Sequence, residues 1–210
     1  MSDLLPLFPL PNVVLFPNVF LPLHIFEPRY REMVTDALAS DRMIGMVLLR
    51  PGWEGDYQGR PPVYRIGCSG VITHVERLLD GRFNIVLRGM ERLRIVSEDH
   101  ARSYRRGVVE SLVEGVMRAE DRAAVRRQRV KLEALLAPAA QKASADARIA
   151  ATMPDEDLVN ALAQYLDLEA LEKQALLEHD CLRSRADALV ELLEMKMLTA
   201  RTPGSFHLAH

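Results

Sequence analysis

Residues 71–95 read VITHVERLLDGRFNIVLRGMERLRI and contain the local signal on which the fold depends. Two runs of mixed apolar and polar residues, 71–79 and 83–87, flank the dipeptide Asp80-Gly81. This dipeptide suits a tight hairpin turn, because glycine adopts positive φ without a steric penalty. Polar and apolar residues alternate along 83–87, and arginines alternate with leucine and isoleucine at the end of the stretch, so one face of each strand is buried and the other is wetted. The stretch therefore predicts an antiparallel hairpin.

Residues 1–115 contain ten of the eleven glycines and several other short β-type runs. The apolar segment 4–11 is interrupted by prolines, which suits an edge strand or an extended segment over a core. We expect a short strand at 13–16, a helix that begins at Pro28, and a buried strand at 43–49. Closing a sheet removes its exposed edges, so many short strands favour a small closed or partly closed barrel here.

Residues 116–202 contain little glycine and show helical periodicity. One helix is expected from about Arg118 to Leu136, with its end near Pro138. Further amphipathic helices with short connections predict a small bundle, and 203–210 is expected to be a flexible tail. The expected fold class is α+β: a small barrel with one helix, followed by a C-terminal helical bundle.

Composition excludes several classes of protein. Apolar residues make up 49% and charged residues 27% of the chain, and the formal net charge of -2 gives no overall attraction to nucleic acid or to an anionic membrane. The first residues lack the basic segment of a signal peptide, and no apolar run reaches the roughly 20 residues that span a bilayer. Cys68 and Cys181 lie far apart and indicate no disulfide framework, so we expect free thiols in a cytoplasmic protein.

No familiar catalytic or metal-binding motif occurs in the sequence. A phosphate-binding P-loop needs glycine directly before its lysine, but the four lysines follow valine, glutamine, glutamate and methionine. No histidine precedes a glutamate and no Cys-x-x-Cys pair occurs, so zinc sites of these kinds are not expected. The run GCSGV at 67–71 lacks the second glycine of a nucleophile elbow, and we interpret it as a bend or bulge. We therefore expect no catalytic residue, cofactor or metal, and name Cys68 and His74 only as candidates for an unfamiliar enzyme site.

Two surface features are candidate partner-binding sites. Arginines recur every three or four residues along the first expected helix. They are Arg118, Arg122, Arg126 and Arg129. This face could contact phosphates or an acidic partner, or it could simply be solvated. Trp53, the only tryptophan, and Tyr57 lie in a glycine-containing loop, where they are either exposed anchors for a partner or a lid over the barrel.

The N-terminal half carries a pattern of motifs. They are LPLFPL at 5–10, NVVLFP at 12–17, LPLHIFEPRY at 21–30, IGCSGVI at 66–72 and DGRFNIVLRG at 80–89. The pattern resembles the Lon protease N-terminal domain family, specifically to about residue 110 and more loosely across the helices. The resemblance implies a PUA-like barrel, a helical bundle and recognition of unfolded or tagged polypeptides. In full-length Lon an ATPase and a Ser-Lys protease domain follow this region. Because this sequence ends at His210, we expect a stand-alone bacterial member without them.

The leading hypothesis is a polypeptide-binding module that is not an enzyme. The alternative is an adaptor or regulator that docks on Lon or another protein through its arginine face. An enzyme with an unfamiliar site is less well supported, because no set of nucleophile, base and orienting group can be assembled. RNA binding would rest on the PUA-like fold alone. We expect polypeptide partners, and neither nucleic acid nor a membrane; the sequence does not define the oligomeric state.

Overall fold

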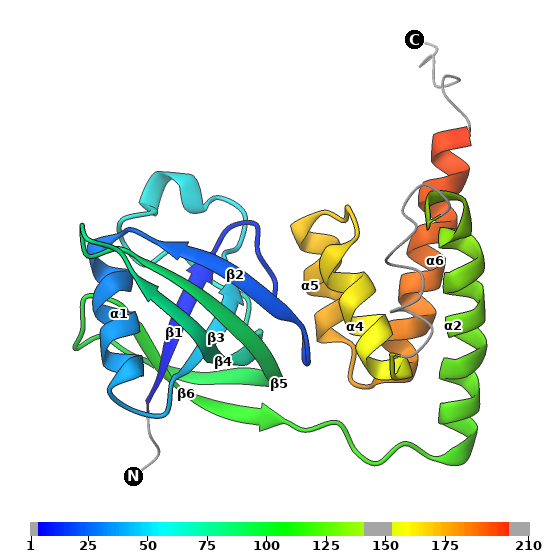
Figure 1. The fold of residues 1–210 in the computed structure, drawn as a ribbon, viewed down its shortest axis with the longest axis horizontal. Coiled ribbons are helices and arrows are strands. Elements are labelled where there is room, and N and C mark those ends of the chain that lie inside the picture. Colours follow the sequence, from blue (N-terminus) through cyan, green and yellow to red (C-terminus); the bar gives the residue numbers. More distant parts are fainter. Residues whose placement is uncertain (1–3, 141–152, 202–210) are drawn as a thin grey trace. The chain divides into compact units, whose positions relative to one another are not determined.

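The hairpin predicted around Asp80-Gly81 is confirmed. Strands β4 (Ile66–Arg77) and β5 (Phe83–Asp99) pair antiparallel, and Gly81 in the turn has a φ of 81°. The computed structural model describes residues 4–140 and 153–201 and has the expected α+β class (Figure 1).

The chain divides into two compact units, and each unit consists of two separate stretches of sequence. The first unit contains Met1–Val113 and Asn160–Glu178, and the second contains Glu114–Val159 and His179–His210. The chain thus leaves the first unit after Val113 and returns to it at Asn160.

A mixed sheet of six strands forms the first unit. The remaining strands are β1 (Leu5–Leu10), β2 (Phe20–Ile25), β3 (Met43–Leu48) and β6 (Arg105–Leu112). Their order is β2-β5-β4-β3-β1-β6, and only β1 and β3 are parallel neighbours. β6 also pairs with the second half of β5, so the pairings β5-β4-β3-β1-β6 return to β5.

Strand β1 is not the predicted edge strand, because it pairs with both β3 and β6. The pairing with β6 covers Leu5 to Leu7 and the pairing with β3 covers Leu7 to Leu10. Pro6 therefore pairs with β6 alone and Pro9 with β3 alone. On the unpaired side of each proline no strand requires its N–H group, so proline is tolerated there.

The predicted strand at 13–16 is also wrong. These residues form a buried connection without strand pairing, and the N–H of Phe16 donates to Oε1 of Gln164 at 3.2 Å. The turn that follows is tied to β5, because the N–H of Asn18 donates to the Gly89 carbonyl at 2.9 Å. The strand begins after this turn, as β2. Among the described strands it pairs with β5 alone, so Pro22 occupies the edge position that proline tolerates.

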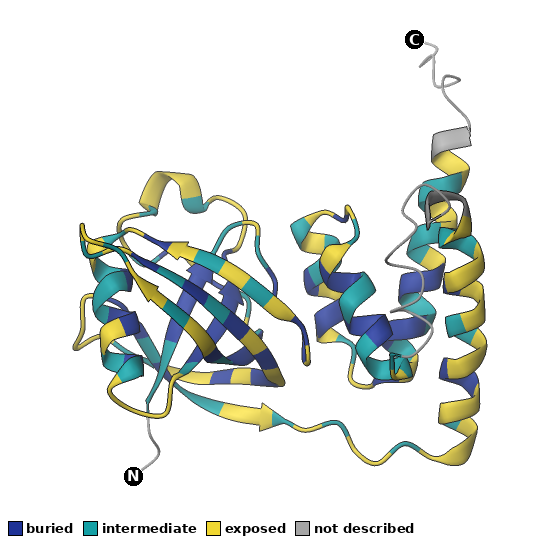
Figure 2. Cartoon of the chain, viewed as in Figure 1, coloured by how far each residue is buried: buried dark blue, intermediate teal, exposed yellow. Residues whose placement is uncertain are grey.

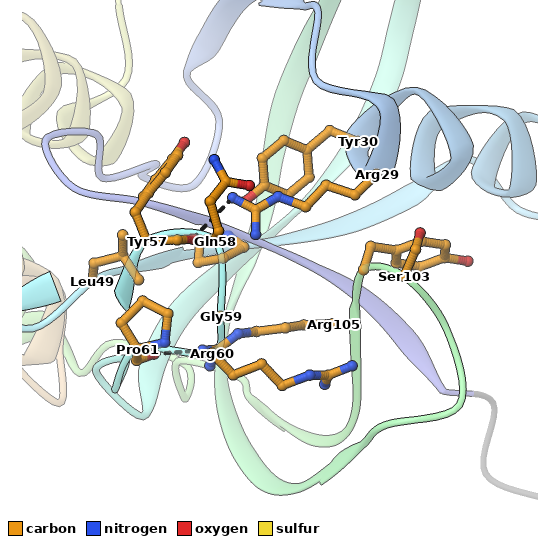
Figure 3. A pocket seen from close by; sticks show the side chains of 12 residues that line it. Arg29, Tyr30, Leu49, Tyr57, Gln58, Gly59, Arg60, Pro61, Ser103 and Arg105 are labelled. Atoms are coloured by element: carbon orange, nitrogen blue, oxygen red, sulfur yellow. Dashed lines mark hydrogen bonds between the residues drawn. The ribbon is translucent and has the colours of Figure 1, made fainter. Parts of the chain in front are cut away.

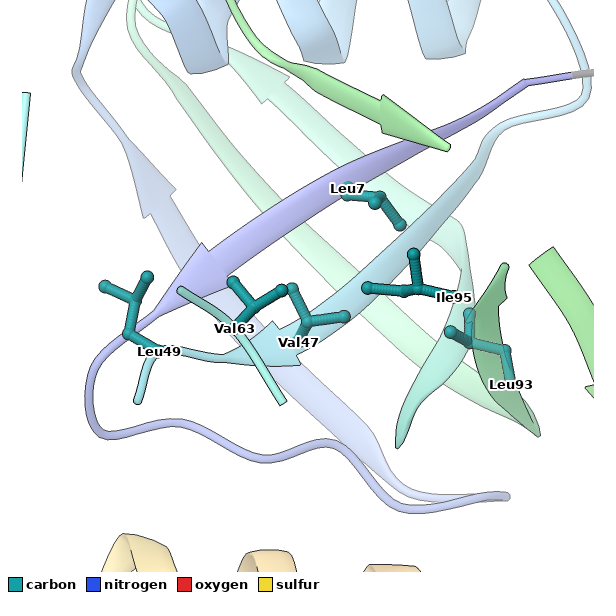
Figure 4. Packing of buried hydrophobic residues seen from close by; sticks show 6 residues of the cluster. All are labelled: Leu7, Val47, Leu49, Val63, Leu93 and Ile95. Carbon is teal, nitrogen blue, oxygen red and sulfur yellow. The ribbon is translucent and has the colours of Figure 1, made fainter. Parts of the chain in front are cut away.

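The core of the first unit follows the alternation that the sequence predicted. Buried and exposed residues alternate along much of β5 (Figure 2). One cluster of buried side chains links β1, β3, β5 and the segment before β4 (Figure 4). It consists of Leu7, Val47, Leu49, Val63, Leu93 and Ile95. Helix α1 (Pro28–Leu38) begins at the predicted proline and packs against β1, where the rings of Tyr30 and Phe8 lie 4.5 Å apart.

Residues 160–178 complete the first unit with the end of α4 (Asp155–Tyr165) and with α5 (Ala170–Glu178). In addition to the bond from Phe16 to Gln164, the side-chain Nε2 of Gln174 donates to the carbonyl of Ile66 at 3.0 Å. Both glutamines are buried, so these bonds fix the two helical segments to the connection before β2 and to the start of β4.

The second unit contains α2 (Ala119–Ala140), the start of α4 and α6 (Leu182–Arg201). The predicted end of α2 near Pro138 is confirmed to within two residues, since the helix is described to Ala140. A proline this close to the end removes one intrahelical hydrogen bond, which the preceding turns can tolerate.

An ion pair with one fully buried partner lies at the start of the second unit. Arg185 on α6 is fully buried, and its Nη2 lies 2.6 Å from Oε1 of Glu114. Burial and the nearby charges of Glu114 and Asp157 raise the pKa of Glu156 above its ordinary value.

The predicted tail at 203–210 lies outside the described residues. Among residues 4–140 and 153–201, no helix combines the length and the apolar character required to cross a bilayer.

Candidate binding surfaces

The segment that carries Trp53 and Tyr57 lies over the core of the first unit. It forms a short 3-10 helix, η1 (Trp53–Asp56), entered through Gly52, whose φ of 90° suits glycine. The two aromatic rings meet edge to face, with centroids 5.4 Å apart. Both side chains are partly buried and pack against the hydrophobic cluster. This packing corresponds to the lid alternative more closely than to a free anchor.

Tyr57 is held by a polar network at the start of α1. Its hydroxyl donates to Oε1 of Glu27 at 2.6 Å, and Nη2 of Arg29 donates to its carbonyl at 3.2 Å. Arg29 also pairs with Oε2 of Glu27 at 3.0 Å. Burial and the hydrogen bond to Glu27 raise the pKa of Tyr57 above its ordinary value. The segment 53–57 is therefore fixed to α1 by charge-assisted bonds as well as by packing.

A small pocket of about 140 Å³ lies beside this network (Figure 3). Arg29, Arg60 and Arg105 reach it from α1, from the loop before β4 and from β6. Arg105 is buried and donates to Glu98 and to the carbonyl of Pro61, and burial lowers its pKa. The pocket is smaller than the roughly 300–1,000 Å³ of typical ligand sites, so it suits one small polar group and not a peptide.

The arginine face of α2 is partly gathered into one groove. Arg122 and Arg126 are exposed and line a groove of about 720 Å³ in the second unit together with Met117 and Val130. Val130 is 61% exposed, so the groove offers apolar surface beside its guanidinium groups.

The other two predicted arginines lie in different settings. Arg118 precedes α2 with 81% of its side chain exposed, and its Nη1 lies 3.8 Å from Glu120. The Arg129 side chain is only 12% exposed and pairs with Glu133 and Asp155, each at 2.9 Å. Arg129 thus joins α2 to the start of α4, within the second unit.

The candidates for an unfamiliar enzyme site do not meet. Cys68 is buried and its Sγ bonds the carbonyl of Ser69, whereas His74 is exposed further along the same strand. They lie six positions apart on the strand, a separation of roughly 20 Å, far beyond hydrogen-bond reach. The predicted bulge in GCSGV is confirmed, because the pairing of β4 with β5 shifts register between Cys68 and Gly70. In the described part of the chain, no group of three or more His, Cys, Asp or Glu residues could hold a metal ion.

Sequence reasoning missed a third surface, which lies on the first unit. Arg50, Arg60 and Arg65 line an open groove of about 640 Å³ together with Val63 and Val96. The arginines are spaced irregularly along a loop, so no helical or strand period reveals them. The available signal was the pair Arg60 and Arg65 on either side of Pro61-Pro62, with no acid between residues 57 and 65.

Comparisons with known proteins give a consistent result. Residues 4–195 match the family model of the ATP-dependent protease La (LON) substrate-binding domain. Lon protease 2 of Desulfotalea psychrophila is 26% identical over 196 residues, a match that covers 92% of this chain and 25% of that protease. The chain therefore spans about a quarter of the length of such curated relatives.

Two solved structures share the fold. The N-terminal domain of a Mycobacterium avium complex Lon protease superposes with a TM-score of 0.73 at 18% identity, covering 91% of this chain and 98% of that one. A Lon N-terminal domain protein from Xanthomonas campestris gives a TM-score of 0.59 at 23% identity, covering 96% and 99%.

Proposed function

This chain belongs to the ATP-dependent protease La (LON) substrate-binding domain family, and we propose on that basis that it is a polypeptide-binding module. The observation that carries the proposal is the family match over residues 4–195, which includes both compact units. Its ligands would be unfolded or tagged polypeptides, held without chemical conversion. The geometry of Cys68 and His74 supports a non-catalytic role, because the two side chains cannot act together.

We further propose that the sheet is a small barrel of the PUA-like type and that the helices of the second unit form a bundle. The circuit of pairings that returns to β5 supports the barrel, since closure removes most free edges. The change of unit after Val113 supports a subdomain boundary near residue 115. We place the protein in the cytoplasm, which suits the free thiols of Cys68 and Cys181.

Binding to a permanently unfolded client tests the function. A carboxymethylated, fluorescently labelled protein would be titrated with the purified chain and followed by anisotropy. We expect saturable binding to the unfolded client and none to the same client in its native fold, because only the former exposes apolar segments. Absence of saturation, or equal binding to both forms, would refute the proposal.

A second candidate function is docking on a protein partner such as Lon. The groove lined by Arg122, Arg126 and Val130 favours it, since it combines exposed cations with exposed apolar surface. The double variant Arg122→Glu and Arg126→Glu should weaken capture by a purified, immobilised Lon protease while leaving binding to the unfolded client unchanged. Equal capture of the parent and the variant, or no capture of either, would rule this function out.

A further inference from the structure

The groove lined by Arg50, Arg60 and Arg65 holds positive charge that the described structure does not neutralise. None of these three guanidinium groups has a carboxylate within ion-pair distance among the described residues. The only acidic residue that lines the groove, Glu98, pairs with the buried Arg105 at 3.2 Å. This concentration of charge occurs on a chain whose formal net charge is -2.

The three arginines stand on firmly placed backbone. The N–H of Arg50 donates to the Pro62 carbonyl at 2.8 Å, and the N–H of Ile95 donates to the Arg65 carbonyl at 2.8 Å. The Arg60 side chain is held by two hydrogen bonds. Its Nη1 donates to the carbonyl of Asp99 at 3.2 Å and its Nη2 donates to the carbonyl of Arg102 at 3.1 Å.

Donor capacity remains at each site. A guanidinium group carries five N–H bonds, of which Arg60 uses two and Arg50 one, toward the Val63 carbonyl at 3.2 Å. Arg65 is exposed, and its guanidinium group has no hydrogen bond or ion pair to the described residues. The free donors are therefore available for a ligand that accepts in pairs, as a carboxylate does.

Apolar side chains line part of the same groove. Val63 and Ile95 belong to the buried cluster (Figure 4). Val96 is 58% exposed. The pairing of β5 with β6 shifts register between Ile95 and Ser97, so Val96 is the extra residue of a bulge. Bulges re-aim side chains and are frequent beside binding sites.

We infer that this groove binds acidic, partly apolar segments of polypeptides, with carboxylates on the arginines and an aliphatic side chain on Val96. The inference rests on the proposed polypeptide-binding function and names the class of segment and its site. Charge complementarity selects this occupant, since carboxylates match the fork of the guanidinium group. Single-stranded RNA fits less well, because among the residues that line the groove no Trp, Tyr or Phe is present and only the His100 ring is available for base stacking.

The test uses two labelled peptides and two double variants of the full chain. One peptide contains leucine, serine and glutamate, and the other has glutamine in place of every glutamate. Arg50→Gln with Arg65→Gln removes two cations of the groove, whereas Arg60 is kept because it holds the loop at 99–102. Arg77→Gln with Arg88→Gln, both exposed, is the control with the same change in net charge. Thermal unfolding verifies that both variants are folded, and the single variant Arg65→Gln serves if the groove variant is not.

Anisotropy titrations should show that the parent binds the glutamate peptide more tightly than the glutamine peptide. The groove variant should lose about tenfold in affinity for the glutamate peptide alone, and added salt should reproduce that loss. The control variant should bind both peptides as the parent does.

Three results would overturn the inference. The first is equal binding of the glutamate and glutamine peptides to the parent. The second is binding of both peptides to the groove variant as tightly as to the parent. The third is binding of single-stranded RNA that is tighter than binding of the glutamate peptide and that the groove variant loses. Binding of an unfolded neutral client distinguishes a failure of the groove assignment from a failure of the proposed polypeptide-binding function. If that client binds and the glutamate preference is absent, only the groove assignment fails; if nothing binds, the proposed function fails with it.

Discussion

Replacing Trp53 with alanine decides whether this residue is a lid over the core or an anchor for a partner. The indole is partly buried, packs on the hydrophobic cluster and meets the ring of Tyr57 edge to face at 5.4 Å. Removing a fully buried tryptophan side chain costs about 3–5 kcal/mol, and an aromatic pair contributes about 0.5–1.5 kcal/mol. Scaled to partial burial, Trp53→Ala should lower the free energy of unfolding by about 2–3 kcal/mol.

Circular dichroism during heating and urea unfolding is the suitable assay, because Trp53 is the only tryptophan and its fluorescence is lost with the substitution. For a chain of this size the melting temperature should fall by roughly 4–12 °C. Glu54→Ala, an exposed change in the same segment, should stay within about 0.5 kcal/mol of the parent. Affinity for the unfolded client should be unchanged at temperatures where the variant is folded.

The opposite pattern would refute the lid. If Trp53→Ala left the free energy of unfolding within about 0.5 kcal/mol of the parent and weakened client binding roughly thirtyfold, the side chain would be a binding hot spot.

Three further outcomes are expected. Gly89→Ala should lower the free energy of unfolding, followed by circular dichroism, by about 3 kcal/mol, because a Cβ would overlap the main chain of the turn before β2. Gly115→Ala should leave that free energy unchanged, because open space surrounds this glycine, and equal stabilities of the two variants would contradict the prediction. The exposed thiol of Cys181 should react quickly with a disulfide reagent and the buried thiol of Cys68 only on unfolding, so two fast equivalents would show that Cys68 is accessible. Burial and a hydrogen bond raise the pKa of Tyr104 from 10.0 to about 12, so the folded state keeps a proton that the unfolded state releases. The free energy of unfolding should therefore fall as the pH rises from about 10 to 12, and it should fall less in Tyr104→Phe than in the parent. An equal fall in the parent and the variant would refute this.

Local sequence signals predicted the local elements of this fold. The turn at Asp80-Gly81, the helix that begins at Pro28 and the buried strand at 43–48 each depend on a few neighbouring residues, and the structure confirms them. The parallel pairing of β1 with β3 and the second pairing of β5 with β6 join distant segments, and neither turn chemistry nor hydrophobic period specifies such partners.

The candidate site residues show the same limit. Helical spacing predicted four arginines along one helix. It could not indicate that Arg129 would form an ion pair with Asp155, which lies 26 residues further along the chain. Arg50, Arg60 and Arg65 share no period, and only the folded loop brings them to one groove. The choice between lid and anchor for Trp53 depended on neighbours such as Val63 that lie outside its own segment.

The return of residues 160–178 to the first unit has a consequence for synthesis on the ribosome. The sheet strands are complete once Leu112 has emerged, yet the buried amide of Phe16 still lacks Gln164, and the carbonyl of Ile66 still lacks Gln174. At roughly 5–20 residues per second, translation needs several more seconds to supply Glu178. During that interval the nascent sheet exposes surface that residues 160–178 will later cover, so the chain passes through a stage in which it resembles the unfolded polypeptides that we propose as its ligands.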